Sequence, residues 1–315
     1  MPRFCDVRRF RPCCRLEPSL PVAAGDNRGG DAHVRDLDAV TRFYETVLGL
    51  AVQARSDTAA VLGADGGVPL VTLVATPDAA APAPRAAGLF HLAILLPSRL
   101  DLGRWTQSMA ASRRTVQGAA DHLVSEAIYL ADPEGNGIEI YRDRPRNEWP
   151  RRDGRIEMDN APLDFDGLLA LARADGTPWT GAPSRTRMGH IHLNVNDLGP
   201  TEGFYVGRLG FDAMATMRGA LFVSAGGYHH HLGLNTWAAR NGAPRDPAAL
   251  GLRHAVIELP DAASLAAYVG ELESAGLAVE RPTSDIALLR DPSGNRLLLA
   301  AGARSAADHL GLADL

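Results

Sequence analysis

The segment Val34-Arg-Asp-Leu-Asp-Ala-Val-Thr-Arg-Phe-Tyr-Glu-Thr-Val-Leu-Gly-Leu50 has a counterpart 161 residues later, Val195-Asn-Asp-Leu-Gly-Pro-Thr-Glu-Gly-Phe-Tyr-Val-Gly-Arg-Leu-Gly-Phe211. In both copies an alternating strand leads into an Asp-Leu pair that can begin a helix, and an amphipathic stretch ends at Leu-Gly. The Val-to-Val and Phe-to-Phe separations are equal, which indicates an internal repeat.

A second pair of segments divides each copy again. Residues 88–97 (GLFHLAILLP) match 251–260 (GLRHAVIELP), and the turn Asp132-Pro-Glu-Gly-Asn136 matches Asp291-Pro-Ser-Gly-Asn295. The pattern predicts four units of strand, helix and three strands (βαβββ). A single unit cannot cover its half-buried sheet, so we expect units to pair and the paired sheets to curve into a cup. The four predicted units are unit one (28–80), unit two (87–143), unit three (188–237) and unit four (250–302).

The chain of 315 residues is long enough for two domains. We expect an α+β protein in which the linker contains one helical patch near residues 165–172. The Arg- and Pro-rich N-terminus reads as a disordered tail or as the product of a start codon placed too far upstream. The expected segments are a tail of 1–27, an N-terminal domain of 28–143, a linker of 144–187, a C-terminal domain of 188–302 and a tail of 303–315.

Composition excludes several classes of function. The net charge of -5 argues against a nucleic-acid or anionic-membrane partner, and no apolar run is long enough to cross a bilayer. The three cysteines lie within the first fourteen residues. The body of the chain therefore cannot depend on disulfides, which fits a cytoplasmic location. Assembly into a homo-oligomer stays open.

Residues 122–139, His-Leu-Val-Ser-Glu-Ala-Ile-Tyr-Leu-Ala-Asp-Pro-Glu-Gly-Asn-Gly-Ile-Glu, predict a strand, a tight turn and a second strand. The turn would fold the second strand back, so that Glu139 points into the same cavity as His122 and Tyr129. A carboxylate beside two proton-handling groups suits a metal site for redox or acid/base chemistry. The alternative is a hairpin whose polar residues face water.

These repeats resemble the vicinal oxygen chelate superfamily, which includes glyoxalases, bleomycin-resistance proteins and extradiol dioxygenases. Over roughly residues 33–300, segments 88–97, 121–129, 189–195 and 226–237 look most like the two-domain catechol-2,3-dioxygenase group of bacteria. The resemblance implies curved mixed sheets and one Fe(II) ion held by two histidines and a glutamate, with Mn(II) or another divalent metal as the alternative. It also implies a small aromatic diol and O2 as substrates.

In the superfamily the metal ligands lie on the first strand of a unit and near its end. This pattern assigns His91 and Glu139 of unit two and His190 of unit three as ligands. Ordinary extradiol enzymes keep the metal within the C-terminal pair of units. Here the set is complete only if units two and three share one cup, unless a ligand comes from elsewhere.

The other units lack part of the ligand set. Unit one has Gly29 where the histidine is expected, and unit four has His254 but Leu298 in place of the glutamate. Because a metal needs a complete set of ligands, His254 is expected to be a core residue. His33 and His309 are expected at the surface.

The resemblance also suggests roles around the metal. His122 resembles a histidine that stabilises oxygen, His230 an acid/base histidine, and Tyr129 a tyrosine that hydrogen-bonds the substrate oxygen. On a strand, His229 and His231 should point away from His230, whereas His192 shares the side of His190. His192 therefore either lines the pocket or replaces His190 as a ligand. Two further residues either shape the substrate mouth or cap a strand, namely Asn235 and Trp237.

The predicted function is an Fe(II)-dependent extradiol dioxygenase that opens a catechol ring beside its hydroxyl groups. One alternative is a glyoxalase-type isomerase or transferase that uses Zn, Ni or Mn. That class usually takes two carboxylate ligands, and only Glu139 is evident. The other is a non-catalytic small-molecule binding protein, as in bleomycin resistance, which needs neither a metal triad nor acid/base histidines.

Overall fold

The computed structural model describes residues 27–152 and 155–314, so the predicted tail and its cysteines lie almost entirely outside the described residues. The four predicted βαβββ units are all present. Their elements are β1 (Asn27–Val34), α1 (Leu37–Thr46), β2 (Ala51–Arg55), β3 (Ala59–Gly63) and β4 (Pro69–Ala75) in unit one; β5 (Gly88–Leu95), α2 (Arg99–Ala111), β6 (Gly118–Asp121), β7 (Ser125–Ala131) and β8 (Gly137–Asp143) in unit two; β11 (Arg187–Asn194), α4 (Leu198–Tyr205), β12 (Asp212–Met217), β13 (Ala220–Ser224) and β14 (Leu232–Asn235) in unit three; and β15 (Gly251–Leu259), α5 (Ala262–Ser274), β16 (Glu280–Thr283), β17 (Ile286–Arg290) and β18 (Arg296–Ala301) in unit four.

Local sequence explains why each unit begins its helix and its last strand where it does. The residue before each helix accepts a hydrogen bond from a backbone N–H of the first turn, which satisfies a donor that would otherwise lack a partner. In the turn before β8, Asp132 Oδ1 accepts from the backbone N–H groups of Glu134 and Asn136, both at 2.9 Å. The turn before β18 repeats these bonds. The four helix caps are Asp36, Ser98, Asp197 and Asp261.

The units pair across the two halves of the chain. One eight-stranded mixed sheet has the order β16-β17-β18-β15-β1-β4-β3-β2, and the other has the order β12-β13-β14-β11-β5-β8-β7-β6. The sheets therefore do not follow the expected division into 28–143 and 188–302. The free edge of each first strand is bound by the first strand of a unit from the other half, β1 by β15 and β5 by β11, both antiparallel. Units two and three thus share one sheet.

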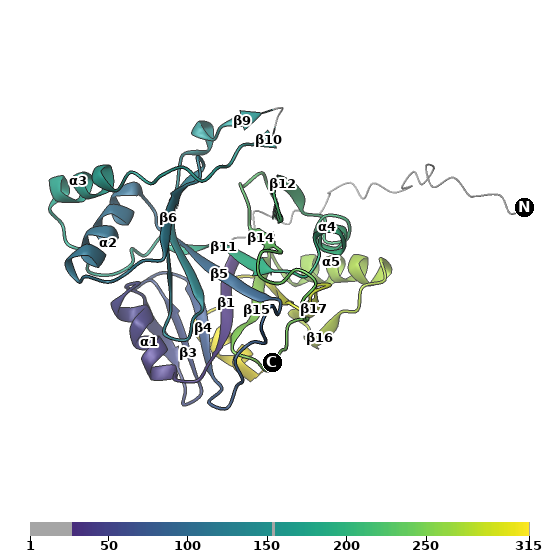
Figure 1. Cartoon of the computed structure of the whole chain (residues 1–315). Coiled ribbons are helices and arrows are strands. Elements are labelled where there is room, and N and C mark those ends of the chain that lie inside the picture. The colour runs from purple at the N-terminus through teal and green to yellow at the C-terminus, as the bar shows by residue number, and fades with distance from the viewer. Residues whose placement is uncertain (1–26, 153–154, 315) are drawn as a thin grey trace, which may run out of the picture.

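A single apolar core joins the two sheets to their helices. In Figure 1, α1 and α2 lie on one side of the central strands and α4 and α5 on the other. Strand alternation decides what each sheet buries: on β8, Ile138 and Ile140 enter this core, whereas Tyr141 belongs to a separate cluster on the opposite face. Polar residues at the alternate positions of unit two therefore face the cup. Within the described ranges no helix combines the length and apolar character needed to span a membrane.

The C-terminal residues pack onto the sheet of units one and four. Residues 306–311 form α6 (Ala306–Gly311), which contacts β2, β3 and β4, and η2 (Leu312–Asp314) follows. Leu312 joins a buried cluster that includes Leu298 of β18. The expectation that His309 lies at the surface is wrong, because its exposed fraction is 2%. The apolar cup of this sheet needs a cover, and the C-terminal helix supplies it.

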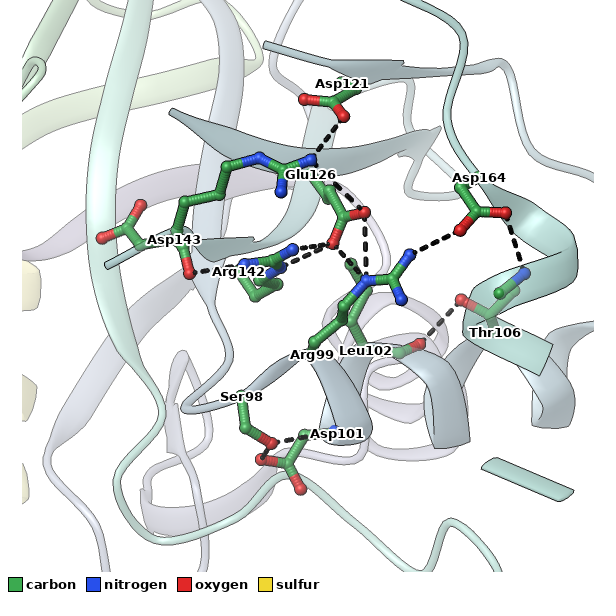
Figure 2. Close-up of polar contacts among 12 residues, drawn as sticks. Ser98, Arg99, Asp101, Leu102, Thr106, Asp121, Glu126, Arg142, Asp143 and Asp164 are labelled. Carbon is green, nitrogen blue, oxygen red and sulfur yellow. Dashed lines mark hydrogen bonds and ion pairs between the residues drawn. The ribbon is translucent and has the colours of Figure 1, made fainter. Parts of the chain in front are cut away.

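The linker forms part of the fold and contains η1 (Arg146–Glu148), β9 (Arg151–Arg152), β10 (Arg155–Ile156) and α3 (Phe165–Asp175). Helix α3 covers the predicted helical patch and packs against α2. Figure 2 shows the ion pairs that fix this arrangement. The buried Glu126 of β7 accepts hydrogen bonds from Arg99 Nε at 2.8 Å and from Arg142 Nε at 2.6 Å, and Arg99 also donates to Asp164 at the start of α3. This network ties the β7–β8 hairpin to the helices.

We predict that Glu126→Gln lowers the free energy of unfolding by about 3–5 kcal/mol, because Arg142 would keep a buried charge without its partner. Urea unfolding measures the change. Glu273→Gln is the matched control, since Glu273 also pairs with an arginine, Arg281 at 2.6 Å, but at the surface. The control should cost less than about 1 kcal/mol. Equal losses in the two variants would contradict the structural role of Glu126.

Candidate metal centre

Three predicted ligands meet at one point of the shared sheet. His91 Nε2 lies 2.9 Å and His190 Nε2 lies 3.1 Å from Glu139 Oε2, and the two imidazole nitrogens are 3.3 Å apart. All three residues are buried. Among the described residues this is the one group of three or more potential ligand side chains with mutually close donor atoms. His192 is not part of it.

Strand register brings these ligands together. β5 lies between β8 and β11, and Ala93 of β5 is opposite Glu139 on one side and His190 on the other. His91 lies two residues before Ala93 and so shares its face of the sheet. Because Ala93 has only a methyl side chain, the three longer side chains can converge above it. The ligand set is therefore a consequence of pairing β5 with β11.

Two glycines leave room for this cluster. A Cβ atom at Gly189 would lie 1.7 Å from the hydroxyl oxygen of Tyr141, and one at Gly233 would lie 2.7 Å from the Cγ atom of His192. Any larger residue at either position would displace a ring that packs beside the ligands. Tyr141 packs against His190 with ring centroids 5.0 Å apart, and His192 packs against His91 at 4.9 Å.

Burial and mutual interaction set the charges of the cluster. Burial tends to raise the pKa of Glu139, but the imidazoles of His190 and His91 outweigh it and hold this pKa well below the usual value. Burial also lowers the pKa of His190 to about 4, against the opposing effect of Glu139. At neutral pH the site thus offers a carboxylate and a neutral His190 imidazole, the protonation states required of metal ligands.

The donor set fits a divalent metal ion. At metal–ligand distances of about 2.1 Å, neighbouring ligands of an octahedral ion lie about 3.0 Å apart, which matches the three separations given above. Two imidazoles and one carboxylate on one face are typical of non-haem Fe(II) sites, and they leave the other positions open. Mn(II) would accept the same donors.

The ligands lie in a pocket with a volume of about 250 Å³. Most other predicted site residues line it as well, namely His122, Tyr129, His192, His230 and Trp237. Asn235 does not: it is buried, and its Oδ1 accepts a hydrogen bond from the backbone N–H of Trp237 at 3.0 Å. Asn235 therefore positions Trp237, which is the capping alternative of the sequence analysis.

His122 and Tyr129 form a pair at the unit-two side of the pocket. His122 Nε2 and the Tyr129 hydroxyl are 2.6 Å apart, and His122 Nδ1 lies 3.0 Å from the carbonyl oxygen of Asp159 in the linker. Since a carbonyl can only accept, His122 Nδ1 donates there, and its Nε2 accepts the hydroxyl proton when the ring is neutral. Burial, and then the charge of Glu139, raise the pKa of Tyr129 well above its usual value, so the phenol stays protonated.

His230 is hydrogen-bonded to His229, which in turn contacts Asp143. The expectation that His229 points away from His230 is wrong, because residues 229–231 precede β14 and do not follow strand alternation. Asp143 Oδ1 lies 2.8 Å from His229 Nε2, and His229 Nδ1 lies 2.8 Å from His230 Nδ1. With His229 neutral, it donates to Asp143 and accepts from His230, which leaves His230 Nε2 with a free electron pair. Asp143 could have been found by alternation, because it lies four residues beyond Glu139 on the same face of β8.

The chain matches known proteins along most of its length. A model of the Glyoxalase/Bleomycin resistance protein/Dioxygenase superfamily matches residues 31–140 and 187–299. Catechol-2,3-dioxygenase of Bacillus subtilis (strain 168) is 42% identical over 267 residues, which cover 82% of this chain and 91% of the relative.

Solved structures share the fold at low sequence identity. A Bacillus subtilis protein provisionally described as a dioxygenase superimposes with a TM-score of 0.65 at 14% identity, covering 91% of this chain and 87% of that chain. Glyoxalase I from Zea mays superimposes with a TM-score of 0.53 at 14% identity, covering 91% of this chain and 95% of that chain.

We predict that Glu139→Ala abolishes metal retention, because it removes the single anionic donor of the cluster. His192→Asn should retain the metal, since His192 lies beside the cluster. Metal content after anaerobic loading with Fe(II) and gel filtration distinguishes the two variants. Normal iron in Glu139→Ala, or loss of iron in His192→Asn alone, would contradict the assigned ligands.

We also predict that the metal-free protein is less stable at pH 5.5 than at pH 7. The pKa of His190 is about 4 in the folded protein and about 6.5 when the chain is unfolded, so the unfolded chain binds the proton first as pH falls. Each buried neutral histidine of this kind should lower the free energy of unfolding by about 1 kcal/mol between pH 7 and pH 5.5. Urea unfolding at the two pH values measures the loss, and His190→Asn should reduce it. Equal stability at both pH values would contradict a buried neutral histidine.

Proposed function

Because the chain belongs to the glyoxalase/bleomycin resistance protein/dioxygenase superfamily, we propose that it is an Fe(II)-dependent extradiol dioxygenase that cleaves a catechol ring with O2. The observation that carries this proposal is the convergence of His91, His190 and Glu139 at the wall of a pocket that also contains proton-handling groups. The relative named catechol-2,3-dioxygenase, 42% identical over most of both chains, supports a dioxygenase-like activity.

The cluster of His91, His190 and Glu139 would hold the iron. A bound Fe(II) ion supplies the redox chemistry and the open positions that let a catechol and O2 react with each other. The protein contributes one negative charge from Glu139 and two neutral imidazoles. The loaded site therefore keeps a net positive charge that attracts an ionised catechol.

His230 is the general base of the proposal. Its Nε2 can accept a phenolic proton when the catechol binds, because Nδ1 is already engaged by His229. The positive charge formed on His230 is then stabilised through His229 by the Asp143 carboxylate. The same nitrogen can return the proton later, as the product forms.

Tyr129 and His122 act on the oxygen atoms of the substrate as a hydrogen-bonded pair. The protonated phenol of Tyr129 can rotate its hydrogen from His122 to an oxygen atom of the substrate. His122, held by the Asp159 carbonyl, keeps its orientation during this exchange. This pair thereby offers a hydrogen-bond donor to oxygen, separate from the base at His230.

The alternative functions receive less support. Among the described lining residues Glu139 is the single carboxylate, whereas a glyoxalase-type site is expected to use two. A protein that only sequesters its ligand would not need the Asp143–His229–His230 series of hydrogen bonds.

We predict that anaerobic loading with Fe(II), followed by catechol and air, gives a yellow ring-fission product. His230→Ala should keep its iron and slow turnover by about 100-fold or more, the usual loss of a general base. Absorbance and iron content are measured on the same samples. Iron loss in this variant would make His230 a ligand instead. Tight catechol binding without product from the unmodified protein would favour a sequestering function.

A further inference from the structure

The turn that carries His122 into the pocket contains a strained residue. Residues 122–124 connect β6 to β7, and the backbone N–H of His122 donates to the carbonyl oxygen of Ser125 at 2.8 Å. Between these two residues, Leu123 has a φ of 69°. A hairpin turn with a positive φ at this position usually has glycine there, because a side chain clashes with the backbone. Leucine therefore holds this conformation only with strain.

Packing does not account for the strained leucine. Leu123 is half-buried and belongs to none of the buried apolar clusters of the described residues. Its neighbour Val124 is buried in one of them, together with Trp149 and Tyr228. Strain in a backbone persists only where the surrounding contacts over-determine the conformation, and it is concentrated at functional sites. Here polar contacts, rather than burial of the leucine, maintain it.

Asp121 holds the turn from the side of unit two. Its Oδ1 accepts from the backbone N–H of Leu123 at 2.9 Å, and its Oδ2 accepts from Arg144 Nη2 at 2.5 Å. The backbone N–H of Arg144 donates in turn to the carbonyl oxygen of Val124 at 2.8 Å. Arg144 also lies 3.8 Å from Glu126, so this anchor continues the network of Figure 2. One oxygen of Asp121 thus has a charged partner, and the other fixes Leu123.

The linker holds the turn from the other side. Asp121 and Ala161 exchange two backbone hydrogen bonds, at 2.8 and 2.9 Å. Two residues earlier, the carbonyl oxygen of Asp159 accepts from His122 Nδ1 at 3.0 Å. The backbone N–H of Asp159 donates to the carbonyl oxygen of His122 in a longer bond of 3.5 Å. The linker therefore contacts both the backbone and the ring of His122.

These contacts select one state of the His122 ring. Because Nδ1 donates to a carbonyl, the neutral ring carries its proton there and presents the electron pair of Nε2 to the Tyr129 hydroxyl, 2.6 Å away. Relaxation of Leu123 to a negative φ would change the course of the chain at the turn. The His122 ring would then move away from Asp159 and Tyr129 and could exchange its tautomers.

Building on the proposed function, in which His122 and Tyr129 act on oxygen atoms of the substrate, we propose that Asp121 is a positioning residue for His122. Asp121 and residues 159–161 of the linker hold Leu123 in its strained conformation, which fixes the tautomer and the direction of the His122 ring. Asp121 itself neither lines the pocket nor belongs to the candidate metal centre. The linker thus contributes to the site as well as joining the two halves of the chain.

Nuclear magnetic resonance of the imidazole nitrogens tests this inference without turnover, on the full-length metal-free protein in alkaline buffer, where an ordinary histidine is neutral. The signal of His122, assigned by its loss in His122→Gln, should show only the tautomer with hydrogen on Nδ1. Asp121→Ala should give a mixture of both tautomers, because the N–H of Leu123 loses its acceptor. Asp121→Asn should keep the single tautomer, because its amide oxygen still accepts. Equal effects of Ala and Asn, or an unchanged His122 in Asp121→Ala, overturn the proposal.

Glycine at position 123 tests the strain itself. Since glycine adopts a positive φ without a clash, adding Leu123→Gly to Asp121→Ala should recover most of the single tautomer. A double variant as mixed as Asp121→Ala overturns the role of strain. Because Asp121 and Arg144 are both partly exposed, these variants should fold, and the signals of the buried His254 report on the fold.

Glu157→Ala is the matched control, because it removes an ion pair with Arg152 elsewhere in the linker. It should leave the tautomer of His122 unchanged. A mixture of tautomers in this variant as well would overturn the specific role of Asp121.

Turnover of the Fe(II)-loaded variants tests the proposed function separately. Asp121→Ala should keep its iron and lose at least about tenfold in kcat, since misplacement of a positioned group slows a reaction. The expected tautomers without ring-fission product from any variant or the unmodified protein would reject the dioxygenase and retain the positioning role. Product from the unmodified protein, together with a single tautomer in Asp121→Ala, would retain the dioxygenase and reject the positioning role.

Discussion

The antiparallel pairing of β5 with β11 is the constraint on which the candidate site depends. It joins the first strands of two units that are about 100 residues apart, and it sets His190 opposite Ala93, on whose other side Glu139 lies. A shift of this register by one residue would turn His91 or His190 to the opposite face of the sheet. The buried network around Glu126 secures the hairpin that delivers Glu139 and Tyr129 to the same cup.

The sheet of units one and four has the same architecture but lacks the metal ligands. Asp31 lies opposite His254 across β1 and β15, as His192 lies opposite His91 across β11 and β5. Asp31 and His254 form a buried pair at 2.7 Å. The position of Glu139 is taken by Leu298, and the space beside Gly29 is occupied by His309 of α6. One cup therefore holds the candidate metal site, and the C-terminal helix fills the other.

Much of this arrangement could be predicted because repeats and alternation are local signals. The unit boundaries follow from capping residues and Asp-Pro turns. The resemblance to the superfamily implied which positions of the repeats carry the ligands. The pairing of β1 with β15 and of β5 with β11 could not be predicted from strand patterns. The residues of a strand show that it lies in a sheet, but they do not specify which strand pairs with its edge. The burial of His309 depends on a cup that only the assembled sheet creates. The link from His229 to Asp143 joins side chains of different units, and it too becomes visible only in three dimensions.

Anomalous diffraction from crystals loaded anaerobically with Fe(II) tests the central claim most directly. The account predicts one strong iron peak within bonding distance of His91 Nε2, His190 Nε2 and a carboxylate oxygen of Glu139, and none beside Asp31 and His254. An iron peak bound elsewhere in the chain, or imidazoles of His91 and His190 that open into different cavities from Glu139, would contradict it.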